Sequence, residues 1–303
     1  MNKKNSIIDI KTGFQCNNNC IFCAQGDKRN FGKTQTTEEI KKTLSESISS
    51  FEGVVLTGGE VTIRKDFLEL VSFAKDCGYK NIFIQTNGRM FSYLELCKRT
   101  IEAGATNFSL SLHGSTPEIH DGLTRIEGGF EQTLKGIKNL LELGAFVSTN
   151  TVVMKTNYLD MPNVAKLLTK IRVSSYQLSF MDINPVIERS EEMIQEIVPR
   201  YKEVRESIEN ALQLGIDQGV RCKVEAFPFC TLGEKYHSHI PGKKFSNYFV
   251  FDGERMTDMI KRRKEKLKWQ GEKCRDCKFY NTCEGPWSNY PKIFGVEEFK
   301  SIK

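Results

Sequence analysis

The sequence contains no run of about 18 apolar residues, which a membrane-spanning helix would need. It has no long stretch of low complexity, and 39% of its 303 residues are hydrophobic, so disorder is not the expected state. The N-terminal segment MNKKNSIIDIKTGF has neither a long apolar stretch nor a small-residue cleavage site, so no secretory signal is expected there. These absences predict a cytoplasmic protein with a full core, as one large α/β domain or one domain plus an appendage.

The excess of charge of one sign is also small, with a formal net charge of +6. A nucleic-acid binder usually concentrates basic residues on one face or stripe. The one dense basic run is KRRKEKLK, residues 261–268, and its ordinary interpretation is a solvated helix face. The alternative is a patch for an acidic partner or a phosphate backbone. The charge distribution therefore argues against a nucleic-acid partner, as the hydropathy argues against a membrane.

Cysteine, in contrast, is abundant, with ten residues. Cytosolic conditions disfavour disulfides, and clustered cysteines in that compartment more often bind metals or carry out redox chemistry. The first cluster is CNNNCIFC, residues 16–23, with no fourth cysteine nearby. This pattern predicts a metal or redox site near the N-terminus.

Short apolar runs alternate with longer segments of helical periodicity in the first 185 residues. Strands are predicted at 6–14, 53–60, 81–88, 106–114, 145–154 and 175–185. Helices are predicted at 36–51, 66–78, 90–104, 129–144 and 159–171. This alternation indicates parallel β-α-β units, and six strands are fewer than the eight of a closed barrel. The predicted fold class is therefore α/β, with a partial (β/α)6 TIM-like barrel.

The unusual residues of this part lie at the predicted strand ends. The cysteine cluster follows the first strand, and TGGE (57–60), TNG (86–88) and SLHG (111–114) end the next three. Asn150 lies on the fifth strand, and MDINP (181–185) ends the sixth. Because ligands of such folds gather where the strands end, we expect these residues to converge on one rim.

The pattern changes after residue 185. A long helix is predicted at 190–218, a short strand at 220–227 and a charged helix at about 254–269, followed by CRDCKFYNTCEGPW at 274–287. The sequence therefore predicts two parts, a barrel over residues 1–185 and a C-terminal α+β extension over residues 186–303.

Three neighbouring thiolates without a fourth restrict the choice of metal. Cys16, Cys20 and Cys23 form the group. The next cysteine, Cys77, lies in a predicted helix, and the first histidine is His113. Structural zinc takes four protein ligands, so it fits poorly. A [4Fe–4S] cluster normally takes four thiolates, so three would leave one iron open for another ligand.

The spacing C-x3-C-x2-C, with Phe22 directly before the last cysteine, resembles the radical S-adenosylmethionine (radical SAM) enzymes. Gly58, Gly59 and Glu60 at the end of the second strand add to a resemblance that covers about residues 7–185. It implies a [4Fe–4S] cluster on the three cysteines, with S-adenosylmethionine (SAM) chelated to the open iron and Phe22 among the cofactor contacts. The two glycines would expose backbone near the methionyl ammonium, because glycine permits close approach. Glu60 would contact the cofactor or be structural.

The resemblance implies four further contacts with SAM. Ser111 and His113 would lie near the ribose or the carboxylate, and Asn150 near the ribose. Arg125 would pair with the methionyl carboxylate, because guanidinium suits planar carboxylates. The alternatives are a buried core imidazole for His113 and a surface side chain for Arg125.

A second cysteine group lies near the C-terminus. Cys274, Cys277 and Cys283, joined by the upstream Cys230, make four ligands, which would close a cluster site. This resembles the auxiliary-cluster extensions called SPASM or twitch domains and implies one auxiliary [4Fe–4S] cluster, with tetrahedral zinc as the alternative. Cys222 is a catalytic candidate if it faces the pocket and donates a hydrogen atom to a substrate radical. It could otherwise replace Cys230 or be an inert core thiol.

The predicted function is a radical SAM enzyme that cleaves SAM reductively to a 5′-deoxyadenosyl radical. That radical would take a hydrogen atom from a C–H bond of a peptide or a small metabolite. An external one-electron donor such as flavodoxin or ferredoxin is implied as a partner. Only 15 residues precede Cys16, so no peptide-binding N-terminal domain is expected. The alternatives are a radical SAM enzyme that acts on RNA and a non-catalytic iron–sulfur or zinc protein.

Overall fold

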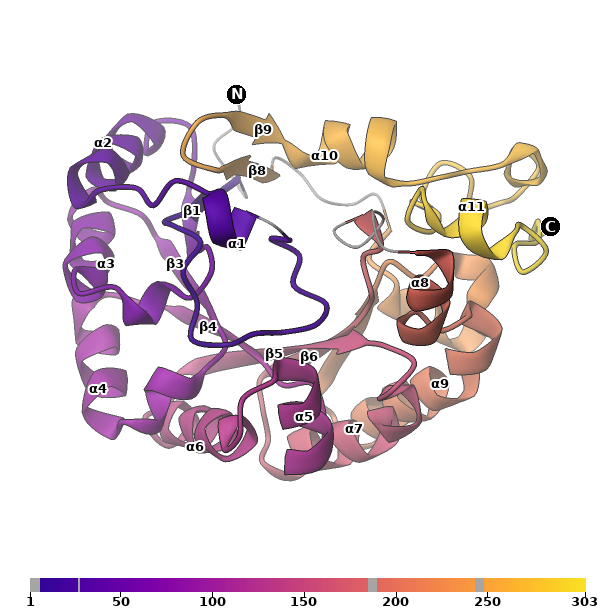
Figure 1. Cartoon of the computed structure of the whole chain (residues 1–303), viewed down its shortest axis with the longest axis horizontal. Helices are drawn as coiled ribbons and strands as arrows, with labels where there is room; N and C mark the ends of the chain where they lie inside the picture. The colour runs from indigo at the N-terminus through magenta and orange to yellow at the C-terminus, as the bar shows by residue number, and fades with distance from the viewer. Residues whose placement is uncertain (1–5, 27, 185–189, 243–247) are drawn as a thin grey trace.

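The computed structural model describes residues 6–26, 28–184, 190–242 and 248–303. Within these residues one curved sheet contains nine strands: β1 (Ile7–Lys11), β2 (Gly53–Thr57), β3 (Asn81–Thr86), β4 (Asn107–Ser111), β5 (Phe146–Val153), β6 (Ser175–Phe180), β7 (Arg221–Glu225), β8 (Tyr248–Phe251) and β9 (Met256–Asp258). The helices of the same residues are α1 (Lys28–Phe31), α2 (Thr37–Ser47), α3 (Phe67–Asp76), α4 (Leu94–Ala103), α5 (Pro117–Thr124), α6 (Gly129–Glu142), α7 (Met161–Lys170), α8 (Glu191–Ile197), α9 (Tyr201–Asp217), α10 (Met259–Arg262) and α11 (Tyr290–Phe294). Figure 1 shows α2, α3, α4, α6, α7 and α9 along the outer side of the sheet.

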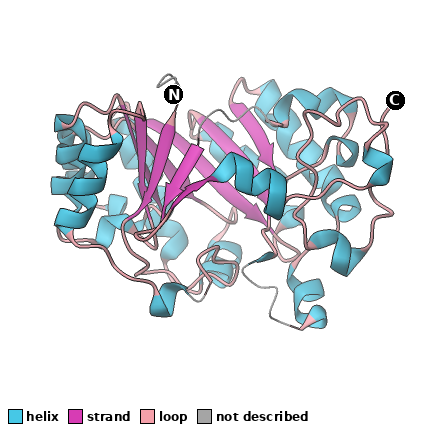
Figure 2. Ribbon diagram, turned by 90° about the horizontal axis from the view of Figure 1, so that it is seen from above, coloured by secondary structure: helices cyan, strands magenta, loops and turns pink. Residues whose placement is uncertain are grey.

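The sheet is an open barrel. Its strand order is β7-β6-β5-β4-β3-β2-β1-β8-β9. Every neighbouring pair from β7 to β8 is parallel, and β9 returns antiparallel to β8. The strands lie side by side as a twisted fan in Figure 2, with the C-terminal segments at one end. The described strands end at β7 and β9 without pairing to each other, so the predicted partial α/β barrel is confirmed.

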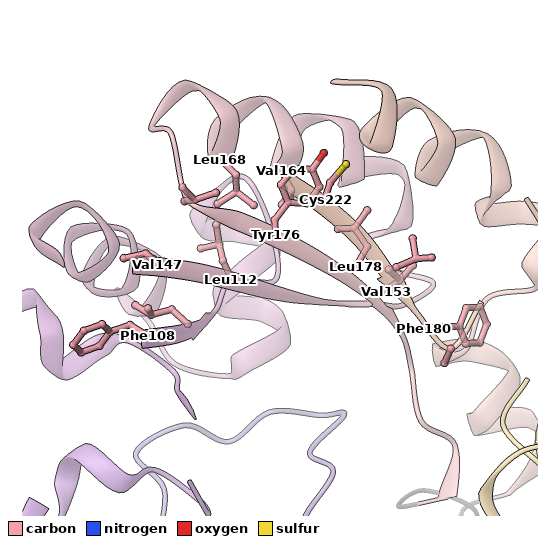
Figure 3. Packing of buried hydrophobic residues seen from close by; sticks show 14 of the residues in the cluster. Phe108, Leu112, Val147, Val153, Val164, Leu168, Tyr176, Leu178, Phe180 and Cys222 are labelled. Carbon is pink, nitrogen blue, oxygen red and sulfur yellow. The ribbon is translucent and has the colours of Figure 1, made fainter. Parts of the chain in front are cut away.

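Alternating side chains give the sheet an apolar and a polar face, as the two-residue period of a strand requires. In β6, Tyr176 and Leu178 are at most 1% exposed, whereas Gln177 and Ser179 are partly exposed. Figure 3 shows Tyr176 of β6 close to Val164 of the helix α7. The apolar face therefore holds the helices, and the polar face is turned to the concave interior.

The helix α2 begins as the sequence predicts. The Thr36 hydroxyl accepts a hydrogen bond from the Glu39 amide at 3.2 Å, and the Glu39 carboxylate accepts one from the Thr36 amide at 2.8 Å. This reciprocal capping box satisfies two amides that have no partner inside the helix. Ile40 and Leu44 on the next turns are fully buried.

Two predicted helices differ from the structure. The segment 190–218 is two helices, α8 and α9, because Pro199 forces Val198 into an extended conformation with φ −98° and ψ 120°. The segment 254–269 contains β9, the short α10 and a π-helical turn (Arg263–Leu267) instead of one charged helix. Gly253, at φ +97°, forms the turn that folds β9 back on β8.

The sheet also extends past the predicted barrel at both edges. β7 pairs with β6, and β8 pairs with β1, although both strands follow residue 185. The predicted boundary between 185 and 186 lies outside the described residues, and the division there stays a prediction. No helix in the described part of the chain is long and apolar enough to span a membrane.

Candidate active site

The cysteine loop starts at the rim where the parallel strands end. The Thr12 amide, directly after β1, donates to the Thr57 carbonyl at 2.8 Å, so the loop begins beside the end of β2. Further on, the Asn19 amide donates to the Thr124 carbonyl at 2.9 Å. Figure 1 shows the loop running across the opening that the curved sheet encloses. The loop is thus held between β2 and the C-terminal end of α5.

The three thiols of the loop are free and partly buried. Burial and the neighbouring thiols Cys16 and Cys23 raise the pKa of Cys20 to about 12. Burial also raises the pKa of Cys16, whose sulfur accepts a hydrogen bond from the Asn18 amide at 3.4 Å. A cation bound among these thiols would stabilise the thiolate forms of Cys16 and Cys20.

Gly58 and Gly59 of the TGGE segment let the backbone after β2 lie close to the backbone that leads into Cys16. A Cβ at Gly58 would lie 2.2 Å from the Gly13 carbonyl oxygen, and a Cβ at Gly59 would lie 2.1 Å from the Gln15 carbonyl oxygen. The Gly59 amide donates to the Gly13 carbonyl at 2.8 Å. The two glycines therefore hold the chain that leads into Cys16, which the sequence analysis did not foresee.

The Glu60 side chain is buried, and both of its carboxylate oxygens accept hydrogen bonds. One carboxylate oxygen accepts from the Thr62 hydroxyl at 2.6 Å and the Thr86 hydroxyl at 2.7 Å, and the other accepts from the Asn87 amide at 2.7 Å. Burial raises the pKa of this carboxyl group, although these hydrogen bonds oppose the shift. Glu60 therefore joins the ends of β2 and β3, which favours the structural alternative for this residue.

His113 lies beneath the cysteine loop. Its ring meets the Phe22 ring edge-on, with 4.5 Å between centroids. Its Nδ1 accepts from the Val152 amide at 3.2 Å, and burial holds its pKa well below 6.5, so the ring is neutral. His120 stacks on it at 5.8 Å and accepts from the His113 amide. The Nδ1 atom of His113 is therefore hydrogen-bonded inside the core, as the core-imidazole alternative expects. The Phe22 ring packs against the imidazole.

Ser111 and Asn150 are brought together on the concave face. They are direct partners in the β4–β5 register. The Asn150 side-chain oxygen accepts from Gln177 at 3.0 Å and from Ser179 at 2.6 Å, which fixes the amide orientation. Arg125 lies apart from them, exposed, at the C-cap of α5 with φ +55° and directly after the carbonyl that holds the cysteine loop.

Two loop-positioning residues were missed by the sequence analysis. The Asn87 side-chain amide donates to the Asn17 oxygen at 2.6 Å and points to the Cys16 sulfur at 3.9 Å. The Arg89 guanidinium bonds the Asn17 carbonyl and, at 3.0 Å, the Asn18 side chain. The TNG segment at the end of β3 was the available signal.

The second cysteine group lines one enclosed, largely apolar pocket. Its four thiols, Cys230, Cys274, Cys277 and Cys283, share this pocket with aromatic rings that include a stacked pair 4.2 Å apart, Phe229 and Phe279. The Cys283 sulfur accepts from the Gly285 amide at 3.3 Å, and the Cys277 sulfur accepts from the Ile302 amide at 3.4 Å. Backbone amides aimed at sulfur are the kind of hydrogen bond that tunes iron–sulfur clusters.

Cys222 does not face the concave interior. Its sulfur lies 3.6 Å from the Leu212 carbonyl of α9 and 3.5 Å from His239 Nδ1. Figure 3 shows it beside Tyr176 on the apolar face of the sheet. Burial raises the pKa of this thiol. The interpretation of Cys222 as a hydrogen-atom donor to a substrate in the pocket is therefore wrong, because β7 turns it toward the helices.

A family model described as the Radical SAM superfamily matches residues 10–168, more than half of the 303-residue chain. The chain belongs to the radical SAM superfamily. It is therefore an enzyme, and the non-catalytic alternative is excluded. Members of this superfamily use a [4Fe–4S] cluster and SAM.

Relatives of this radical SAM enzyme differ in what they act on. It is 25% identical to the Fe-coproporphyrin III synthase of Methanosarcina barkeri, over 89% of this chain and 80% of the relative. It is 34% identical to a probable GTP 3′,8-cyclase of Thermococcus kodakarensis, over only 46% and 45% of the two chains. Among solved structures, SAM-bound SuiB of Streptococcus suis is similar with a TM-score of 0.68 at 13% identity, covering 99% of this chain and 77% of SuiB. The anSMEcpe structure with bound AdoMet gives 0.67 at 15% identity, covering 97% and 92%.

Both cysteine groups offer free thiols, which are the ligands of iron–sulfur clusters and of structural zinc. Among the described residues, no three His, Cys, Asp or Glu side chains are placed to hold one metal ion. The donor chemistry of both groups fits an iron–sulfur cluster, and that of the C-terminal group fits zinc as well.

Proposed function

We propose that this radical SAM enzyme binds its [4Fe–4S] cluster through Cys16, Cys20 and Cys23 and takes a hydrogen atom from a polar substrate, a peptide or a small metabolite, in the concave interior. When bound, the cluster and SAM together supply the 5′-deoxyadenosyl radical that does this. The radical SAM fold with three free thiols at its rim supports the cofactor assignment. The polar concave face supports the class of substrate.

The side chains of this face form rows across neighbouring strands. Ser111 pairs in register with Asn150, Asn150 with Gln177, and Gln177 with Lys223. A filled barrel interior is dominated by branched apolar residues, whereas these side chains carry hydroxyl, amide and ammonium groups. Such a surface offers hydrogen bonds along its length, so it favours a substrate rich in polar groups over a large apolar one.

The remaining residues of the rim are proposed to hold SAM. Gly58 and Gly59 keep the cysteine loop against β2, which leaves the end of that strand beside the cluster. Ser111 and Asn150 present hydroxyl and amide groups for the ribose. Arg125, held next to the loop in a left-handed conformation, is proposed to pair with the methionyl carboxylate. A non-glycine residue at positive φ costs energy, and such strain concentrates at functional sites.

We further propose one auxiliary [4Fe–4S] cluster on Cys230, Cys274, Cys277 and Cys283. Their shared pocket and the amides aimed at two of the sulfurs support it. RNA as a substrate receives less support, because the basic run 261–268 is not one continuous exposed face. In this run, Arg263 is ion-paired with Glu225 and Glu284, and Lys268 is buried.

The cofactor assignment is tested by comparing Cys16→Ala with Cys77→Ala after anaerobic reconstitution. Cys77 lies on an outer helix end and serves as the matched loss of one thiol. With an added reductant or a flavodoxin- or ferredoxin-type donor, wild type and Cys77→Ala are expected to produce 5′-deoxyadenosine from SAM, and Cys16→Ala is expected to produce none. Production by Cys16→Ala at the wild-type rate would remove the assignment.

A further inference from the structure

Lys268 is a buried cation with no hydrogen-bond partner. Its residue is 9% exposed, and its Nζ makes no hydrogen bond to any residue that the structure describes. The ammonium lies 3.7 Å from the centroid of the Trp287 ring, a cation–π contact that only partly replaces hydration. A buried charge is costly unless it is paired, so Lys268 needs a partner that these residues do not supply.

The nearby carboxylates do not fill this role. Glu225 and Glu284 both pair with the Arg263 guanidinium. Asp182 accepts from the Asn184 amide at 3.0 Å, and burial raises the pKa of its carboxyl group. Burial and the Arg263 charge lower the pKa of Lys268 to about 8, so its ammonium is still the major form at neutral pH.

Lys268 lines a cleft at the same rim as the cysteine loop. The cleft holds about 730 Å³ and is also lined by Arg263, Trp269 and Glu284, a size within the range of small-molecule sites. The Trp287 indole beneath Lys268 donates to the Phe180 carbonyl at the carboxyl end of β6. Parallel strands end at one edge of the sheet, so Lys268 and the loop after β1 lie on the same rim.

We propose that Lys268 binds a carboxylate group of the substrate in this cleft. The inference rests on the proposed function only in assigning the cleft to the substrate. A carboxylate would give the Lys268 ammonium both a hydrogen-bond acceptor and a partner with a single negative charge. A dianionic phosphate fits less well, because three carboxyl groups surround a site with one unpaired cation.

The test is calorimetric titration of the anaerobic holoenzyme, without reductant, with N-acetylglycine and with its neutral analogue N-acetylglycinamide. We expect saturable binding of the acid and at least tenfold weaker binding of the amide, because a hydrogen bond to a charged group is worth about one power of ten or more. Lys268→Met should weaken binding of the acid at least tenfold. Lys266→Met, an exposed lysine two residues away, should leave it within threefold.

Thermal unfolding separates binding from folding. Lys268→Met and Lys268→Gln are expected to unfold at or above the wild-type temperature, because each removes an unpaired buried charge. Equal binding of acid and amide, absence of saturable binding of the acid, or wild-type affinity in Lys268→Met would each overturn the proposal. Because no turnover occurs in this titration, failure of the SAM-cleavage test would leave its result unchanged.

Discussion

Gly58 directly follows β2 with φ +146°, and its Cα faces the backbone that leads into Cys16. Gly58→Ala would place a methyl group 2.2 Å from the Gly13 carbonyl oxygen, which cannot move without displacing the cysteine loop. We expect a loss of about 2–4 kcal/mol in the free energy of unfolding, from overpacking and positive φ together. We also expect a lower iron content after reconstitution, measured by denaturant unfolding and iron analysis.

Gly144→Ala is the matched control for this change. Gly144 also has positive φ, +75°, but no atom lies within 4 Å of a Cβ built there. It should cost only about 1 kcal/mol and leave the iron content unchanged. Equal iron content in the two variants would show that Gly58 does not hold the loop.

His120 makes stability depend on pH. Burial lowers the pKa of its imidazole from 6.5 to about 4, and its Nε2 has no partner among the described residues. As pH falls below 6.5, the unfolded state takes up a proton that the folded state does not, so the folded state loses stability until pH 4 is approached. We expect a loss of about 2 kcal/mol from this residue between pH 7.5 and 5.

The measurement is urea unfolding of wild type and His120→Asn at both pH values. Asparagine keeps an acceptor for the His113 amide but does not titrate in this range. The variant should therefore show the smaller loss of stability. Parallel pH profiles for the two proteins would contradict a buried neutral His120.

The residues that carry specific chemistry could be predicted from the sequence, whereas the residues that hold them in position could not. The spacing of Cys16, Cys20 and Cys23 carries its meaning in the sequence, because three thiols so close together need a common ligand. Asn87 and Arg89 act through contacts with the loop about 70 positions away, and no local pattern encodes those contacts.

At the level of elements, β7 and the C-terminal cysteine segment give a direct test of the second cluster. Cys277 lines the cysteine pocket, whereas Cys222 is turned toward α9. Reconstituted wild type is expected to carry about eight irons per chain and Cys277→Ala about four, because an incomplete ligand set loses its cluster. Cys222→Ala should retain about eight.

Iron and sulfide analysis with the absorbance spectrum checks these values. Eight irons in Cys277→Ala would remove it from the ligand set. A loss in Cys222→Ala equal to that in Cys277→Ala would return Cys222 to the candidates.

Elements with a strong two-residue or helical period were predicted with the correct first residue. β3 and α6 each end two residues before their predicted ends at 88 and 144, and β6 ends at Phe180, five residues before its predicted end at 185. The prediction of one charged helix over 254–269 was wrong. The composition of this segment suits a helix, but the turn at Gly253 and the pairing with β8 make its first part a strand. Pairing with a distant partner overrides local propensity.

At the scale of the whole molecule, Arg263 ties together segments that the sheet itself leaves apart. β7 lies at one edge of the sheet, and α10, directly before Arg263, follows the β8–β9 hairpin at the other. The guanidinium bonds Glu225 at the end of β7 and Glu284 in the cysteine segment. This three-way contact joins the open side of the barrel to the C-terminal segment.

Removing this arginine should therefore weaken the contact between the open side of the barrel and the C-terminal segment. Arg263→Met leaves two poorly exposed carboxylates, 14% and 18% exposed, without their shared cation. We expect a loss of about 3–5 kcal/mol in the free energy of unfolding. The triple variant with Glu225→Gln and Glu284→Gln should recover most of it, because neither position then carries a carboxylate that has lost its cation.

Arg205→Met is the matched control, since its pair with Glu209 lies on the surface of α9 and is half exposed at the arginine. Removal of such a pair costs at most about 0.5 kcal/mol. Denaturant unfolding with proteolysis of the C-terminal segment measures both effects. If Arg263→Met loses no more stability than Arg205→Met, the open side of the barrel is held by the aromatic core around Tyr201 and Tyr290 instead, whose rings lie 4.8 Å apart.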